Sequence, residues 1–244
     1  MAPAAIDWDA GLIMLVLGVD SSTMAEGIAL AEGDRVLGEV NSHLPATHSE
    51  RLLPAIRALL ERLSLPIGQV DGFAVTLGPG SFTGVRIGIA TVRGLALSCG
   101  RPAVGISTLE ALAWWVGATR RGWICPFMNA GRGEVYGALF RSEEGTVRRF
   151  SEDRVCPPEL LLEELPADPV CFPGEGAGSY RNLLEERPGA RPEDLPLGYH
   201  PFLGGWTAVL GGRLLEGRDG REAPSLRPNY LRNPDAQTGS TAGC

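Results

Sequence analysis

The residues best placed to do chemistry form a glycine turn in front of a helix. Gly78, Pro79 and Gly80 follow the apolar segment Phe73–Leu77. Ser81 then precedes a run of small and apolar residues. The free backbone N–H groups at a helix N-terminus make such a turn a natural anion site. The same residues also build tight connections from a strand to a helix, in which glycine supplies positive φ. The sequence alone leaves both interpretations open.

Two common phosphate-binding motifs are excluded at this turn. A Walker A loop requires a lysine after its last glycine, and the chain contains no lysine. The dinucleotide fingerprint requires the spacing G-x-G-x-x-G, and here the third glycine, Gly84, lies one residue too late. Any phosphate contact would therefore belong to another nucleotide fold.

A second polar turn follows the first apolar strand, Leu15–Val19, and consists of Asp20, Ser21, Ser22 and Thr23. A hairpin comes next, so this segment resembles the opening unit of the actin, Hsp70 and sugar-kinase superfamily. There the turn surrounds the phosphates of a nucleotide and an aspartate lies near the metal. From the residues alone, the favoured interpretation of Asp20 is a turn residue bonded to its own backbone.

The composition narrows the class of protein. The chain is 44% hydrophobic and 21% charged, which is ordinary for a globular protein. Its net charge of −7 argues against a broad nucleic-acid surface. The five scattered cysteines fit reduced thiols better than disulfides. Met14 directly precedes the first strand, the start has no positive signal region, and no apolar run has membrane-spanning length. We expect a soluble cytoplasmic protein with an N-terminal extension.

The hydrophobic periodicity predicts an α/β protein in which the first half is a mixed sheet with helices on its faces and a second module begins near Trp123. The predicted divisions are an extension at 1–13, a first lobe at 14–120, a smaller second lobe at 121–232 and a disordered tail at 233–244. In the first lobe the predicted order is β-β-β-α-β-α-β-α. The predicted elements of the second lobe are strands at Ile124–Met128, Glu134–Arg141 and Val170–Phe172, and helices at Pro157–Leu165, Ser179–Glu186 and Leu203–Leu215, with 188–201 irregular. Its strand, turn and hairpin repeat those of residues 15–40, which indicates an internal duplication.

Six blocks of the sequence resemble the TsaB (YeaZ) family and occur in the order found in that family. Gly78–Gly88 is the most specific of them. They are Val19–Thr23, His48–Pro54, Gly78–Gly88, Ile106–Leu112, Gly133–Tyr136 and Pro228–Arg232. The resemblance implies the actin-like ATPase (ASKHA) fold, an α/β fold of two related lobes, each with a mixed sheet flanked by helices. It also implies a non-catalytic, dimer-forming subunit of the complex that makes threonylcarbamoyladenosine (t6A) at adenosine 37 of tRNAs reading ANN codons.

The resemblance further implies the partners. They are TsaD, the related threonylcarbamoyltransferase, and the ATPase TsaE, with a homodimer when the chain is alone and tRNA reached only through the complex. No cofactor is required, and weak ATP or ADP binding is left open. An ATP-dependent phosphotransferase or ATPase using Asp20 and the Gly78–Gly84 loop is the alternative.

The resemblance places the partner interface on two helices, one after His48 and one after Gly84. The implied interface residues are His48, Glu50, Arg51, Leu52, Gly84, Arg86, Ile87, Gly88 and Thr91. Gly84 and Gly88 share a helix face, and their small size favours close approach of another helix. Packing against the chain's own sheet is the alternative. We expect an arginine or glutamate at Gly88 to block partner binding and leave the fold intact.

The resemblance also implies a vestigial nucleotide site and no metal site. The vestigial positions are Asp20, Ser21, Ser22, Thr23, Gly78, Pro79, Gly80, Ser81 and Gly176. TsaD holds its metal through two histidines, and the matching positions here are Thr108 and Leu112, which are poor ligands. A metallopeptidase is excluded on the same ground. In the second-lobe turn, Asn129–Glu134 lacks one carboxylate and one guanidinium of the usual family pattern, which weakens a charged-nucleotide clamp.

Overall fold

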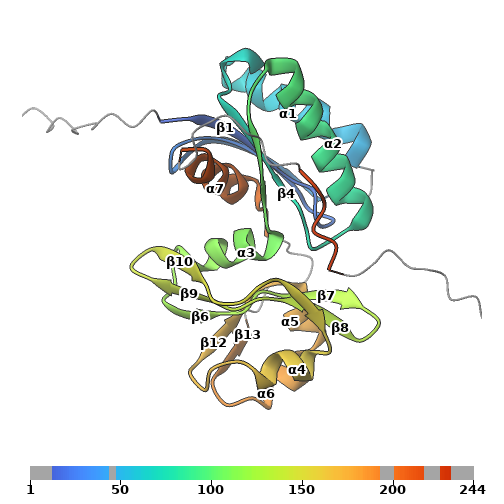
Figure 1. Ribbon diagram of the computed structural model, residues 1–244, viewed down its shortest axis with the longest axis vertical. Coiled ribbons are helices and arrows are strands. Elements are labelled where there is room, and N and C mark those ends of the chain that lie inside the picture. Colours follow the sequence, from blue (N-terminus) through green and yellow to red (C-terminus); the bar gives the residue numbers. More distant parts are fainter. Residues whose placement is uncertain (1–12, 44–47, 193–200, 217–225, 232–244) are drawn as a thin grey trace, which may run out of the picture.

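The computed structural model describes residues 13–43, 48–192, 201–216 and 226–231. These residues form two lobes, one above the other in Figure 1, with helix α3 between them. The predicted tail at 233–244 and the extension up to residue 12 lie outside the described residues. Among the residues that the structure describes, none of the helices combines the length and the apolarity that crossing a bilayer requires.

The first lobe contains the predicted order of strands and helices. Its elements are β1 (Leu15–Asp20), β2 (Glu26–Glu32), β3 (Arg35–Ser42), α1 (His48–Arg62), the 3-10 turn η1 (Ile67–Gln69), β4 (Gly72–Thr76), α2 (Phe82–Cys99), β5 (Ala103–Ile106) and α3 (Thr108–Gly117). The five strands form one sheet in the order β3-β2-β1-β4-β5. β1 pairs antiparallel with β2 and parallel with β4, so the sheet is mixed, as predicted.

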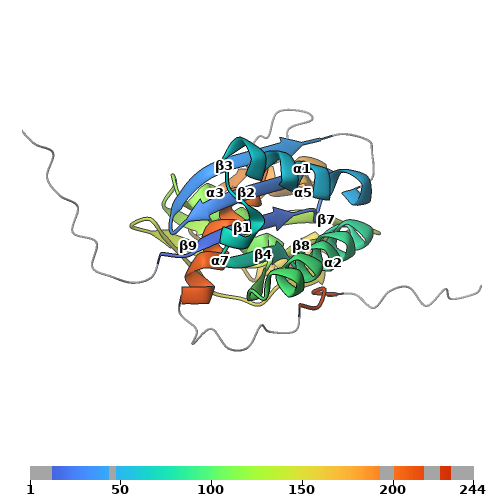
Figure 2. The same ribbon diagram turned by 90° about the horizontal axis from the view of Figure 1, so that it is seen from above.

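Alternation along β1 assigns its side chains to two layers. Leu17 and Val19 belong to the core under α1 and α2, which lie over opposite halves of the sheet in Figure 2. Val16 and Gly18 face α7 (Gly204–Glu216) on the other side. A Cβ added to Gly18 would lie closer than 3.0 Å to the backbone of Ala208, so glycine permits this close crossing. The first lobe is therefore a sheet covered on both faces.

The second lobe repeats the sheet of the first. Its elements are β6 (Gly122–Ile124), β7 (Phe127–Gly131), β8 (Glu134–Gly137), β9 (Phe140–Glu143), β10 (Thr146–Arg149), β11 (Arg154–Cys156), α4 (Pro158–Glu163), β12 (Val170–Phe172), α5 (Glu175–Ser179), α6 (Arg181–Glu185) and β13 (Ala190–Pro192). The order β10-β9-β6-β12-β13 matches β3-β2-β1-β4-β5, with the same parallel and antiparallel pairings. The internal duplication is confirmed, but the hairpin equivalent to β2 and β3 is β9 and β10. The predicted hairpin around residues 129–133 is formed by β7 and β8, which belong to a separate sheet with β11.

Several predicted boundaries in the second lobe are wrong. The strand predicted at Ile124–Met128 is split at Pro126, whose nitrogen carries no hydrogen for the ladder. The strand predicted at Glu134–Arg141 is likewise split into β8 and β9. The segment predicted as irregular contains β13, which pairs with β12, and the helix predicted at Ser179–Glu186 is divided between α5 and α6.

The chain returns to the first lobe at its C-terminal end. α7 packs on β1, β2 and β4, and Leu226 joins the core under α1 and α2. The segment Leu226–Leu231, red in Figure 1, runs beside the first lobe. The predicted second lobe at 121–232 is therefore wrong for these two segments, because a helix pattern alone does not show which sheet the helix will cover.

Candidate partner-binding site

The Asp20 turn is closed by its own hydrogen bonds. The Oδ1 atom of Asp20 accepts from Ser22 N at 3.0 Å, Ser22 Oγ at 2.7 Å and Thr76 Oγ1 at 2.7 Å. Asp20, Ser21 and Ser22 are each 0% exposed. Thr23, partly exposed, uses its hydroxyl to accept from Ala25 N at 3.1 Å. The interpretation of Asp20 as a turn residue bonded to its neighbouring backbone is confirmed, and Thr76 on β4 adds a contact that the sequence did not suggest.

The glycine turn lies directly on the Asp20 turn. Ser81 N donates to Ser22 O at 2.6 Å, and a Cβ on Gly80 would lie closer than 3.0 Å to that same oxygen. Gly78, with φ of 98°, and Pro79 are buried. At the start of α2, Gly84 N donates to the hydroxyl of Ser81, its N-cap. Atoms of the chain itself therefore occupy N–H groups that an anion would use, and the geometry favours the tight connection.

Two glycines of the second lobe, Gly174 and Gly176, also allow a close approach between backbone segments. Gly176 lies in α5, and a Cβ there would lie closer than 3.0 Å to Phe127 O on β7. Gly174, just before the helix, makes the same close approach. Gly176 is buried, and the backbone of β7 covers it. Its position is explained by the approach of α5 to β7.

Helix α3, which the resemblance aligns with the metal helix of TsaD, is an ordinary core helix here. Leu112 is 2% exposed and belongs to a core cluster, and Thr108 is 0% exposed. Thr108 N donates to Gly78 O at 2.9 Å, which joins α3 to the glycine turn. Within the described part of the chain, histidine, cysteine, aspartate and glutamate form no group of three that could hold a metal. His200 lies outside that part.

Gly84 and Gly88 face the inside of the first lobe, which contradicts their assignment to the partner interface. The Ser21 hydroxyl donates to Gly84 O at 2.9 Å. A Cβ on Gly88 would lie closer than 3.0 Å to Ser21 Oγ and 3.3 Å from Val75 Cγ2. Both glycines are buried. Packing against the chain's own sheet is the correct alternative, and an intact fold with arginine at Gly88 is not expected.

Of the α1 residues assigned to the interface, some are buried in the first lobe and others are exposed. Leu52 is 1% exposed and belongs to the first-lobe core, so its assignment to the interface is wrong. Arg51 is 14% exposed and its guanidinium lies 4.0 Å from the Glu26 carboxylate. Glu50 is exposed. α1 begins at His48, as predicted, but the side chain of His48 lies outside the description.

A stripe of side chains on α2 faces outward instead. We call it the α2 stripe, and its exposed residues are Phe82, Arg86, Ala90, Arg93 and Leu97. The spacings of three and four residues place them on one side of the helix. Phe82 is 43% exposed and Leu97 is 81% exposed, which is high for large apolar side chains. Of the interface residues assigned from the sequence, Arg86 is on this stripe, and Ile87 and Thr91 lie half-buried beside it.

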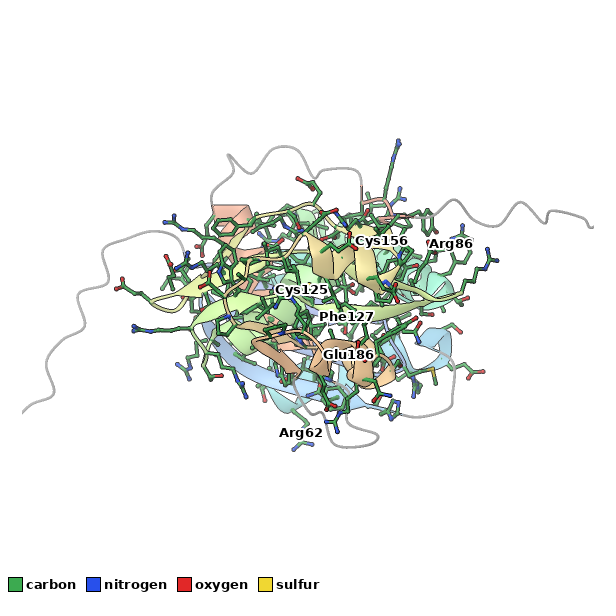
Figure 3. The ribbon with its side chains drawn as sticks, turned by 90° about the horizontal axis from the view of Figure 1, so that it is seen from below. Arg62, Arg86, Cys125, Phe127, Cys156 and Glu186 are labelled. Carbon is green, nitrogen blue, oxygen red and sulfur yellow. The ribbon has the colours of Figure 1, made fainter. Side chains whose placement is uncertain are left out.

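The C-terminal segment packs against the first turn of α2 and extends the stripe. Asn229 N donates to Leu77 O at 2.7 Å. The rings of Tyr230 and Phe82 stack with centroids 5.2 Å apart. The Arg86 guanidinium lies 3.6 Å from the centre of the Phe82 ring, and its Nε donates to the Tyr230 hydroxyl at 2.5 Å. Figure 3 shows Arg86 at the outer edge of the molecule, while Cys125 and Phe127 lie near its centre.

Sequence reasoning missed Phe82, Leu97 and Tyr230. The buried residues Val85, Ile89, Val92 and Ala96 repeat every three or four positions and mark the inward side of α2. Reading that pattern would have placed Gly88 inward and Phe82 outward. For Tyr230 the sequence held no comparable signal, because the contact with α2 joins residues far apart in the chain.

Comparisons with known proteins agree with this architecture. A sequence model of the TsaD family, described as tRNA N6-adenosine threonylcarbamoyltransferase, matches residues 40–177. The tRNA threonylcarbamoyladenosine biosynthesis protein TsaB of Bacillus subtilis is 31% identical over 226 residues, covering 92% of this chain and 96% of that protein. Its Escherichia coli counterpart is 35% identical over 160 residues, covering 62% of this chain and 66% of that protein. The solved structure of YeaZ from Pseudomonas aeruginosa is 31% identical, with a TM-score of 0.77, and covers 90% of this chain and 100% of that chain.

Proposed function

Because the chain belongs to the TsaB (YeaZ) family, we propose that it acts in tRNA threonylcarbamoyladenosine biosynthesis as the non-catalytic subunit that binds TsaD. The observation that carries this proposal is the α2 stripe, an exposed helix face on a lobe that its relatives share. Beside it, α1 exposes Leu53 to 53%. The chain supplies the surface, and TsaD supplies the chemistry of transfer.

The composition of the α2 stripe suits a protein partner. Exposed aromatic and arginine side chains dominate the binding energy of many interfaces. Phe82 and Leu97 lie at opposite ends of the stripe, and Arg86 and Arg93 lie between them with the small Ala90 at the centre. The TsaD family model matches the part of the chain that contains both α1 and α2. We propose that the equivalent helix pair of TsaD packs against this surface in a pseudo-symmetric arrangement.

The closed glycine turn supports the non-catalytic part of the proposal. Ser22 O and the Ser81 hydroxyl accept hydrogen bonds from N–H groups at the start of α2. A nucleotide phosphate would have to displace both contacts and separate two buried turns. We therefore expect the chain alone to neither hydrolyse ATP nor modify tRNA, with TsaE and tRNA joining through the complex. A homodimer of the isolated chain would use the same surface and compete with TsaD.

The test compares charge introduced on the stripe with charge introduced elsewhere. Ala90→Glu and Leu97→Glu should weaken co-purification with TsaD by at least about 30-fold in affinity, the size of a hot-spot substitution. Transfer of the threonylcarbamoyl group by the mixture should fall in parallel. Leu160→Glu is the matched control, since Leu160 is 50% exposed on α4 of the other lobe. Unchanged TsaD binding by both stripe variants would overturn the proposed interface.

A second measurement separates the subunit role from an enzyme role. Calorimetric titration of the purified chain with Mg·ATP should give no heat of binding at micromolar concentrations. Micromolar binding together with ATP turnover in the absence of TsaD and TsaE would favour the ATPase alternative. Full tRNA modification by TsaD and TsaE without this chain would contradict the subunit role itself.

A further inference from the structure

The second-lobe sheet presents an outward surface along β6, β9 and β10. Phe140 and Ser142 on β9 point inward and are buried, and α3 packs on that inner side. Because successive residues of a strand point to opposite faces, Arg141 lies on the outer side, where it is 44% exposed. Arg148 on β10 is also exposed. We call the outer group Trp123, Arg141, Arg148 and Phe150 the arginine–aromatic face.

The pairing register brings three members of this face into one row across the sheet. Arg148 is opposite Arg141, and Arg141 is opposite Trp123. Like charges directly opposite each other on neighbouring strands are destabilising. Glu143 offsets part of that repulsion at Arg141, and an anion bound between Arg141 and Arg148 would offset more of it. The row therefore offers two neighbouring guanidinium groups to a negatively charged ligand.

The aromatic members of the face are held in fixed positions. Trp123 Nε1 donates to Asp168 Oδ2 at 3.3 Å, and the Arg141 guanidinium lies 5.0 Å from the Trp123 ring centre. Phe150 meets Trp123 edge to face, with ring centroids 4.8 Å apart. Phe150 is nevertheless 54% exposed. An exposed ring held beside arginines is the arrangement that stacks a nucleic-acid base.

A groove continues the face around Trp123. Its cavity of about 310 Å³ is lined by Arg120, Arg121 and Arg141 together with Asp168. Two carboxylates contact these side chains: Asp168 accepts from Trp123, and Glu143 Oε1 lies 2.8 Å from Arg141 Nε. The lining of the groove itself holds three arginines and one carboxylate, so it is positive although the net charge of the chain is −7.

We propose that the arginine–aromatic face is a direct RNA contact of the assembled complex. The guanidinium groups of Arg141 and Arg148 bind phosphates of the tRNA, and Phe150 stacks on an unpaired base. RNA fits better than an acidic protein segment, because each nucleotide brings both a phosphate and a flat aromatic surface. This inference rests on the proposed function, because the complex brings the tRNA. The isolated chain then adds to the affinity of the complex without binding tRNA tightly itself.

The test uses the complex of the full chain with TsaD and a fluorescently labelled, unmodified tRNA transcript that reads an ANN codon. Anisotropy titrations at several salt concentrations give the affinity and its salt dependence. The double variant Arg141→Ala/Arg148→Ala should weaken binding about tenfold and lower the slope of log affinity against log salt by about two. Phe150→Ala should weaken binding about tenfold at all salt concentrations, because stacking is less sensitive to salt than phosphate contact.

Matched controls lie on the same lobe. Arg181→Ala removes an arginine that is 46% exposed and near Glu185, much as Arg141 is near Glu143. Leu160→Ala removes an apolar side chain that is 50% exposed, close to the exposure of Phe150. Neither control should change the affinity or the salt slope.

The outcomes separate this inference from the proposed function. Unchanged tRNA affinity and salt slope in complexes that still contain the double variant and TsaD would overturn the RNA contact alone. Loss of TsaD binding by the double variant would also overturn it and assign the face to a protein contact. Failure of the unaltered chain to bind TsaD at all would instead overturn the proposed function.

Discussion

Gly88 decides between two interpretations of α2, and a substitution there can be worked out from the structure. Alanine at a glycine in a helix interior normally adds about 1 kcal/mol of stability. At Gly88, however, the new Cβ would lie closer than 3.0 Å to Ser21 Oγ. The Ser21 hydroxyl must then leave its hydrogen bond with Gly84 O. Displacing a buried hydroxyl and overpacking the contact together cost about 3 kcal/mol. Gly88→Ala should therefore lower the free energy of unfolding by about 2 kcal/mol.

The second half of the experiment removes the atom that clashes. Ser21→Ala alone should cost about 1 kcal/mol, the worth of one hydrogen bond. In the double variant the new Cβ lies 3.7 Å from Ser21 Cβ and 3.3 Å from Val75 Cγ2, so only the Val75 methyl has to move, by a few tenths of an ångström. The helix-propensity gain of about 1 kcal/mol then offsets the lost hydrogen bond, and the double variant should be close to the unaltered chain. Additive effects would instead give a loss of about 3 kcal/mol, so a coupling of that size is expected.

Urea unfolding followed by tryptophan fluorescence measures all four proteins, since the chain has five tryptophans. The four free energies of unfolding can be compared when their slopes against urea concentration agree. A stabilised Gly88→Ala variant with weakened TsaD binding would refute the reasoning and return Gly88 to the partner interface. Additive losses would show that Ser21 is not the group that excludes a side chain at Gly88.

Two further predictions use neighbouring or contrasting residues. Leu52→Ala should lower the free energy of unfolding by about 2–5 kcal/mol, because Leu52 is 1% exposed. Leu53→Ala, at a position that is 53% exposed, should change the free energy of unfolding little and should weaken TsaD binding. Equal urea midpoints for the two variants would contradict this prediction. Burial raises the pKa of the Cys125 thiol to about 12, so at pH 8 an alkylating reagent should modify the half-buried Cys99 well before Cys125. Mass spectrometry of a labelling time course checks this, and equal rates in the folded chain would speak against a buried Cys125.

Local patterns predicted most of the elements and little of the packing between them. The predicted start of α2 near Ser81 is confirmed, because a serine N-cap accepting from Gly84 N is a local contact. β12 occupies the predicted Val170–Phe172, since a short buried strand between turns has a clear signature. The partners of these elements are set by residues distant in sequence. Ser21 decides what fits at Gly88, and no pattern within α2 contains that information.

In the candidate site, too, the sequence predicted the elements but not how they pack. The two helices that carry it follow from the sequence, but the side of each helix that faces solvent depends on the sheet beneath. Leu52 and Leu53 are adjacent leucines on α1, and one is buried while the other is exposed. The family resemblance points to the same two helices as the proposed interface, but Leu52 and Gly88 lie on their buried sides.

The crossing of α7 over the first-lobe sheet has a consequence for synthesis of the chain on the ribosome. The last strand of that sheet, β5, and α7 are separated by roughly 100 residues. At typical translation rates this interval takes about 5–20 s. During that time Val16, Ala74 and Val104 have no cover from Leu215, and a nascent first lobe exposes an apolar sheet face. The lobe therefore completes its fold only after the second lobe has been made, so a chain truncated before α7 should aggregate rather than fold into a smaller working domain.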